Sequence, residues 1–112
     1  MGSPGQANTI GHTDAKALWA RVQAGEAVQI LDVREPWEHA QGVIAGALVI
    51  PMNEVRGRLG EIDASRPVTV ICHMGSRSAM VAGFLARQGL EAINVDDGMD
   101  GWERNGFPTI RG

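Results

Sequence analysis

The sequence predicts an α/β fold built on a largely parallel sheet. Short runs of apolar, often β-branched residues alternate along the chain with segments of helical character. One run, residues 68–71, is unbroken and apolar or β-branched, as is typical of a strand buried on both faces of a sheet. With 112 residues, 44% of them hydrophobic, the chain can bury one core without disulfides or metals. We therefore expect a flexible leader over residues 1–8 and a single domain over residues 9–112.

The N-terminal part of the domain predicts a helix and then a strand. The helix opens at residue 12 or 13 and runs through Ala24, because Leu18 and Val22 recur on one side and a glycine follows. Residues 28–31 are mostly apolar and predict the first strand.

The next segment predicts a short helical turn, a second strand and a second helix. Residues 35–41 form the turn, which Pro36 opens because proline suits the first helical position. Residues 47–50 form the strand, since a proline stops the apolar run. Asn53 is a suitable N-cap for a helix that runs toward Leu59.

The C-terminal half predicts two strands, each followed by a helix. The strand over 68–71 leads into a helix from Ser76 to Gln88, and the strand over 92–95 leads into a short helix from residue 99 to 105. Parallel sheets bind ligands at the carboxyl ends of their strands. The chemistry of the protein is therefore expected at this edge.

The only cysteine, Cys72, ends the clearest strand and is the candidate nucleophile. A glycine-containing loop follows it, and then the helix that begins at Ser76. Such a loop can turn its backbone N–H groups inward, and the helix adds its free first-turn N–H groups and the positive end of its dipole. Arg77 is placed to close the rim of this anion cradle or to bind an incoming anion.

This environment should lower the pKa of the Cys72 thiol, because helix N-termini and cations favour the thiolate. A free thiol is only about 3% ionised at neutral pH, whereas a pKa lower by about two units makes it about 75% ionised. Since the thiolate is the reactive species, the gain in nucleophile exceeds tenfold.

Four ordered blocks of the chain resemble the single-domain rhodaneses, a family of sulfurtransferases. Residues 72–78 (Cys-His-Met-Gly-Ser-Arg-Ser) are similar to the active loop Cys-x-x-Gly-x-Arg-Ser. Residues 31–38 resemble Leu-Asp-Val-Arg-x-x-x-Glu, residues 42–51 resemble Gly-His-Ile-Pro-Gly-Ala-x-x-Ile-Pro, and residues 98–102 resemble the late Gly-Gly-x-x-x-Trp. The resemblance covers nearly the whole chain, from residue 10 to 108.

The chain departs from the family pattern at three positions. Val43 stands where the family usually has His, Ala45 where it has Pro, and Asp97 where it has the first glycine of the late pair. These positions are chiefly structural, so the departures leave the nucleophile unchanged.

The resemblance implies a rhodanese-like fold, a five-stranded, mainly parallel sheet with helices on both faces. It also implies double-displacement chemistry without a cofactor. Cys72 would take the sulfane sulfur of a donor such as thiosulfate as a persulfide, and cyanide, a thiol or a sulfur-accepting protein would then remove it. The loop would bind the substrate through five residues: His73, Met74, Gly75, Ser76 and Arg77.

Two further residues, Asp32 and Arg34, follow another strand and are expected to support the site. They should stand near the cradle, with Asp32 accepting hydrogen bonds within its own loop and Arg34 pairing with Glu38. We expect this role to be structural.

Two other classes of function stay open. The first is a non-catalytic module of the same fold that binds a protein partner, although such modules usually lack the cysteine, which is present here. The second is an arsenate reductase or phosphatase. Related domains of that class have five residues between cysteine and arginine, whereas four separate Cys72 from Arg77. The smaller ring fits a sulfur atom better than a tetrahedral oxyanion.

Composition and charge argue against several partners and sites. A net charge of −3 gives no electrostatic reason to bind nucleic acid, and the longest apolar stretch, residues 45–52, is too short to cross a membrane. One cysteine and three separated histidines predict no metal site. An unpaired thiol favours a reducing compartment, so the expected location is the cytoplasm.

Overall fold

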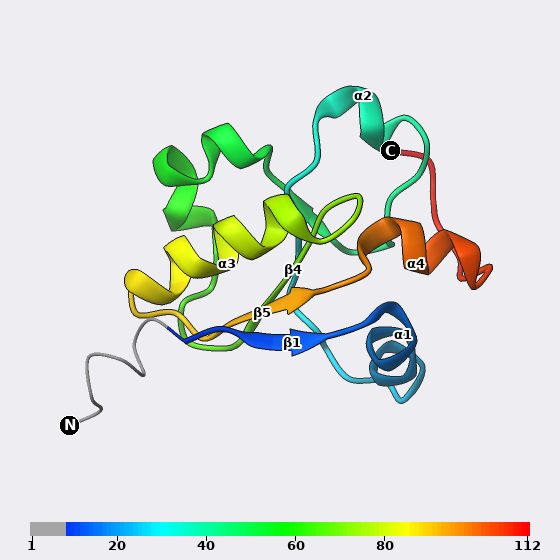
Figure 1. Cartoon of the computed structure of the whole chain (residues 1–112), viewed down its shortest axis with the longest axis horizontal. Coiled ribbons are helices and arrows are strands. Elements are labelled where there is room, and N and C mark those ends of the chain that lie inside the picture. The colour runs from blue at the N-terminus through cyan, green and yellow to red at the C-terminus, as the bar shows by residue number, and fades with distance from the viewer. Residues whose placement is uncertain (1–8) are drawn as a thin grey trace.

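The centre of the molecule is a five-stranded sheet in which every pair of neighbouring strands is parallel (Figure 1). The computed structural model describes residues 9–112, so the expected leader over residues 1–8 lies outside the described residues. The spatial order of the strands is β1-β5-β4-β2-β3. Their bounds are Gly11–Thr13 (β1), Ile30–Asp32 (β2), Leu48–Val49 (β3), Val68–Ile71 (β4) and Ala92–Val95 (β5).

Helices cover both faces of the sheet, as the predicted fold class requires. One core cluster lies under α3 and the two 3-10 helices, and a second lies under α1 and α4. In Figure 1, α3 and α1 lie on opposite sides of the sheet. The α-helices are α1 (Ala15–Gln23), α2 (Pro36–His39), α3 (Ser76–Arg87) and α4 (Gly98–Arg104), and the 3-10 helices are η2 (Met52–Glu54) and η3 (Arg56–Glu61).

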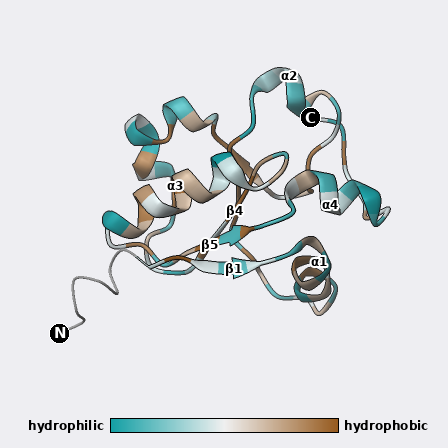
Figure 2. Ribbon diagram, in the orientation of Figure 1, coloured by the Kyte–Doolittle hydropathy of each residue, from teal (hydrophilic) through white to brown (hydrophobic). Residues whose placement is uncertain are grey.

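The central strand β4 determines the direction of the cysteine side chain. Successive side chains of a strand point to opposite faces. Val68 and Val70 belong to the cluster under α3, whereas Ile71 belongs to the cluster under α1 and α4. Cys72 continues the alternation and packs on the α3 side. The hydrophobic colour of β4 and the hydrophilic colour at the C-terminal end of α4 in Figure 2 mark the buried and exposed parts of this layered arrangement.

The prediction of a helix from residue 12 or 13 is wrong at its start. Residues 11–13 form the edge strand β1, which pairs with β5, and α1 begins at Ala15. Asp14 caps this helix, since its carboxylate accepts the N–H of Ala17 at 2.8 Å.

The prediction of a helix capped by Asn53 is also wrong. Pro51 precedes η2, and the segment then continues as η3, which is kinked at Arg58. Glycines at positions 57 and 60 disfavour a regular α-helix here. No helix among residues 9–112 is both long and apolar enough to cross a membrane.

Candidate active site

The loop after β4 takes its shape from Gly75, the residue just before α3. Its φ of 98° lies in the left-handed region, and a Cβ built there would stand 2.2 Å from the carbonyl oxygen of Asp96. Only glycine therefore fits both the backbone conformation and the close approach to the segment after β5. This tight turn brings the start of α3 back over the cysteine.

The sulfur of Cys72 is surrounded by hydrogen-bond donors. The N–H of Gly75 donates to Sγ at 3.1 Å, and the hydroxyl of Ser78 donates to it at 3.3 Å. Cys72 is only 1% exposed, so these donors act on the sulfur with little competition from water.

The donors determine the protonation of the thiol. Burial raises the pKa of Cys72, because it disfavours the charged thiolate. The hydroxyl and backbone N–H of Ser78 and the backbone N–H groups of Gly75 and Met74 lower it, and together they outweigh burial. The pKa of the Cys72 thiol is therefore below its ordinary value, in the direction that the sequence predicts.

Two carbonyl groups at the start of the loop accept hydrogen bonds from α4. The oxygen of Cys72 accepts the N–H of Met99 at 2.8 Å, and the oxygen of His73 accepts the N–H of Asp100 at 2.9 Å. Gly98 allows this contact, since a Cβ there would lie 2.4 Å from the oxygen of His73. Because α4 binds these acceptors, the loop presents N–H groups to the sulfur.

Arg77 forms a two-point ion pair with a residue of α2. Its guanidinium donates to the two carboxylate oxygens of Glu38 at 2.7 and 2.8 Å. This hydrogen-bonded pair, against the opposing effect of burial, lowers the pKa of Glu38 to about 2. The pair joins α2 to the start of α3, at the rim of the loop. A role of Arg77 in binding substrate stays a prediction.

Asp32 and Arg34 form a buried pair beside the site. The guanidinium of Arg34 donates to Asp32 at 2.8 to 3.1 Å, and the Asp32 carboxylate also accepts the backbone N–H of Arg34 at 3.0 Å. The expected pairing of Arg34 with the Glu38 side chain is wrong, because Arg34 reaches only the Glu38 backbone carbonyl. Asp32 has the local acceptor role that the sequence predicts.

The remaining loop residues named from the sequence lie at the surface. His73, Met74 and Ser76 are exposed, with Met74 at 64%. The loop stabilises the sulfur through a backbone N–H group, and a role of these three side chains in binding substrate stays a prediction.

Sequence reasoning missed the roles of two residues at the site: Ser78, which donates to the sulfur, and Glu38, which pairs with Arg77 and not with Arg34. Ser78 lies on the first turn of α3, and the helix geometry brings its hydroxyl back to the cysteine six positions earlier. The serine that ends the quoted loop motif was the available signal. Glu38 lies 39 positions from Arg77, and no local pattern predicts their contact.

Among residues 9–112, no group of three or more His, Cys, Asp or Glu side chains is arranged to hold a metal ion. The polar groups around Cys72 are donors, which suit an anion.

Comparisons with known proteins agree with the motif blocks. The family model "Rhodanese-like domain" matches residues 14–105. A sulfurtransferase of Allochromatium vinosum is 34% identical over 102 residues, which are 90% of this chain and 95% of that protein. The thiosulfate sulfurtransferase GlpE of Actinobacillus pleuropneumoniae is 37% identical over 92 residues, 80% of this chain and 83% of its own. The crystal structure of a rhodanese-related protein from Thermoplasma volcanium matches with a TM-score of 0.83 and 33% identity, covering 90% of this chain and 98% of that one.

Proposed function

Because the chain belongs to the family of rhodanese-like domains, we propose that it transfers a sulfane sulfur from a donor such as thiosulfate to cyanide or a thiol. Relatives named sulfurtransferases support a sulfurtransferase-type function. The observation that supports the mechanism is the ring of donors around one sulfur, with Gly75 N–H at 3.1 Å and Ser78 Oγ at 3.3 Å from Sγ of Cys72.

In the first step, the Cys72 thiolate attacks the outer sulfur of thiosulfate. A bond forms between Sγ and that sulfur, the sulfur–sulfur bond of the donor breaks, and sulfite leaves with the bonding electron pair. The product is a persulfide on Cys72. We expect the backbone donors that stabilise the thiolate to stabilise the anionic persulfide as well.

In the second step, a nucleophile attacks the terminal sulfur of the persulfide. Cyanide takes up this sulfur and is released as thiocyanate, whereas a thiolate acceptor takes it up and is converted to a persulfide. In both cases the Cys72 thiolate is the leaving group, so a lowered thiol pKa also favours this step. The short loop, with four residues between Cys72 and Arg77, favours one added sulfur over a tetrahedral phosphate or arsenate.

We place this reaction in the cytoplasm, because a reducing compartment keeps the single thiol of Cys72 free.

Intact mass spectrometry after incubation with thiosulfate tests the proposal. We expect the protein to gain the mass of one sulfur atom and to lose it on addition of cyanide. The matched control is Cys72→Ser, which removes the only thiol of the chain and should stay unmodified.

Two other results would assign the protein elsewhere. Wild-type protein that gains no sulfur yet hydrolyses a phosphate ester is an oxyanion enzyme. Wild-type protein that gains no sulfur and turns over neither class of substrate is a non-catalytic member of the family.

A further inference from the structure

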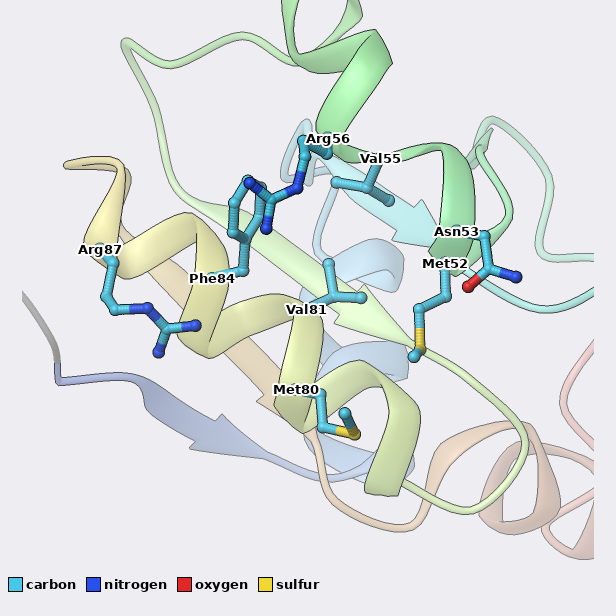
Figure 3. A pocket seen from close by; sticks show the side chains of 8 residues that line it. All are labelled: Met52, Asn53, Val55, Arg56, Met80, Val81, Phe84 and Arg87. Atoms are coloured by element: carbon cyan, nitrogen blue, oxygen red, sulfur yellow. The ribbon is translucent and has the colours of Figure 1, made fainter.

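A groove of about 350 Å³ runs along α3 on the face that also holds the cysteine. Figure 3 shows that its walls come from α3 on one side and from the η2–η3 segment on the other. Cys72 does not line it, so the sulfur chemistry proposed above leaves the groove without a role. Its lining residues are Met52, Asn53, Val55, Arg56, Met80, Val81, Phe84 and Arg87.

The groove combines an apolar floor with two arginines that have no acidic partner. Val55 and Val81 are buried at its base, while Arg56 and Arg87 are exposed. The guanidinium of Arg56 lies over the ring of Phe84, 4.9 Å from its centroid. Within residues 9–112, neither arginine forms an ion pair with a carboxylate.

The pairing of a neighbouring arginine contrasts with that of Arg56 and Arg87. Arg58, two positions from Arg56, pairs with both Glu54 and Glu61. Both carboxylates are therefore bound to Arg58, and neither pairs with Arg56 or Arg87. In a protein whose net charge is −3, this groove thus combines apolar side chains with two arginines that pair with no carboxylate among residues 9–112.

The groove starts beside the loop that holds the cysteine. Met80 lies four residues after Ser76, about 6 Å along the axis of α3, and Arg87 lies about 16 Å along it. The exposed large apolar side chains near the loop are Trp37 on α2, Met74 in the loop and Met80. They are three of the four such side chains described, so apolar surface concentrates around the loop and the entrance of the groove.

We propose that this groove binds an acidic segment of the protein that accepts sulfur from Cys72. Carboxylates of the segment would pair with Arg56 and Arg87, and apolar side chains between them would contact Met52, Met80 and Phe84. The segment would hold a cysteine of the partner above the loop. This inference rests on the proposed function.

The chemistry of the transfer is the second step described above. The partner's thiolate attacks the terminal sulfur of the Cys72 persulfide, a persulfide forms on the partner, and the Cys72 thiolate leaves. The two arginines of the groove favour an occupant that carries carboxylates. The chain's own residues 1–8 contain no Asp or Glu, so they do not supply the carboxylates that Arg56 and Arg87 require.

Two synthetic peptides of equal length test the proposal. Each has one N-terminal cysteine, followed by Leu alternating with Glu in one peptide and with Lys in the other. The protein is loaded with thiosulfate and desalted, and the appearance of peptide persulfide is followed by mass spectrometry. Each rate is divided by the rate of the same protein with cyanide. At low ionic strength, we expect the acidic peptide to react about tenfold faster than the basic one.

Single and double variants test whether the preference for the acidic peptide comes from the two arginines of the groove. Arg56→Gln and Arg87→Gln should each reduce the preference for the acidic peptide severalfold, and the double variant should abolish it. Arg104→Gln on α4 is the matched control, because it removes the same charge from an exposed arginine of the other helical layer. An equal loss in Arg104→Gln would assign the effect to net charge and overturn the proposal.

Further outcomes separate this proposal from the one before it. Equal rates for the two peptides would overturn the groove proposal alone. If thiosulfate leaves no persulfide on the wild type, the proposed function fails. Fluorescence anisotropy with labelled, cysteine-free peptides then tests the groove directly, and equal affinities would overturn it. Dimerisation of the wild type in the ultracentrifuge that Arg56→Gln abolishes would assign the groove to a second copy of the chain and overturn the proposal as well.

Discussion

Two loops at the same edge of the sheet use their polar groups in opposite ways. In the loop after β2, the Asp32 carboxylate accepts hydrogen bonds from the guanidinium and the backbone N–H of Arg34, and the guanidinium also donates to the carbonyl groups of Glu38 and Gly42. The loop after the neighbouring strand β4 directs donors to the sulfur of Cys72, and the carbonyl groups of Cys72 and His73 accept N–H groups of α4. The charged groups of the first loop are thus already paired inside the protein, whereas the second loop keeps its donors for an anion. Both loops lie at the carboxyl end of a strand, so their position alone does not distinguish them. Their hydrogen-bond partners show which loop can bind an anion and hold the reactive sulfur.

The largest effect is expected when the buried Asp32–Arg34 ion pair is broken. Arg34→Met should lower the free energy of unfolding by about 3–5 kcal/mol, because it leaves the Asp32 carboxylate buried without its partner. The measurement is urea unfolding, with the double variant Asp32→Asn/Arg34→Met as control, which should recover part of the loss. Protein that keeps its stability and loses sulfur transfer would instead put Arg34 in contact with substrate.

The next effect concerns the shape of the β4 loop. Gly75→Ala should lower the free energy of unfolding by at least about 2 kcal/mol, because its Cβ meets the Asp96 carbonyl in a left-handed backbone conformation. Gly89→Ala is the matched control, since its φ is 90° and no atom lies within 4 Å of the added carbon. We expect the control to cost about 1 kcal/mol. Equal losses in the two variants would mean that contact with Asp96 is unimportant.

A smaller effect is expected from removing the Ser78 hydroxyl, which tests how the hydrogen-bond donors act on the sulfur of Cys72. Ser78→Ala should raise the pKa of Cys72, because it removes one hydrogen bond to the thiolate. The ionised fraction at neutral pH then falls, and the rate of alkylation by iodoacetamide falls with it. Ser76→Ala is the control, since that hydroxyl is exposed and the backbone N–H stays. A profile of alkylation rate against pH that is the same in both variants would contradict the assignment.

The smallest effect concerns the link between α2 and α3. The folded pKa of Glu38, about 2, lies below its ordinary 4.5, so the stability it contributes is present above pH 4.5 and is lost as the pH falls toward 2. Glu38→Gln should therefore lower the free energy of unfolding by about 1 kcal/mol at neutral pH, a value reduced because Arg77 is partly exposed.

This difference from the wild type should narrow as the pH falls below 4.5. Urea unfolding at both pH values measures it, and Glu26→Gln, which removes an exposed carboxylate paired with Arg21, should show no resolvable change. If the difference in the free energy of unfolding between the two proteins grew as the pH fell, it would contradict a lowered pKa of Glu38.

The parts of the fold that the sequence predicts well are the ones with a strong local pattern. The strands over 68–71 and 92–95 have the predicted bounds, and α3 ends one residue early, because continuous apolar runs and helical spacing are local signals. The edge strand β1 has only three residues, Gly-His-Thr, and its strand character comes from pairing with β5. Local propensity could not predict it.

The site divides in the same way. Cys72 and the loop follow from a strand, a glycine and a helix in succession, which are all local. Ser78 and Glu38 depend on contacts made by folding, across the helix turn and across 39 positions. The pairing of Arg34 was predicted with the wrong carboxylate, because Glu38 at four positions suits a helix, whereas Asp32 shares the turn after β2.

The most direct test of the central claim is the pKa of the single thiol, followed by the ultraviolet absorbance of the thiolate as the pH is raised. The Cys72→Ser protein supplies the baseline, and free cysteine titrated in the same buffers supplies the reference. The donors around the sulfur predict a midpoint below that of free cysteine. A midpoint at or above it would mean that burial outweighs the donors, and it would contradict the account of this site as a stabilised thiolate.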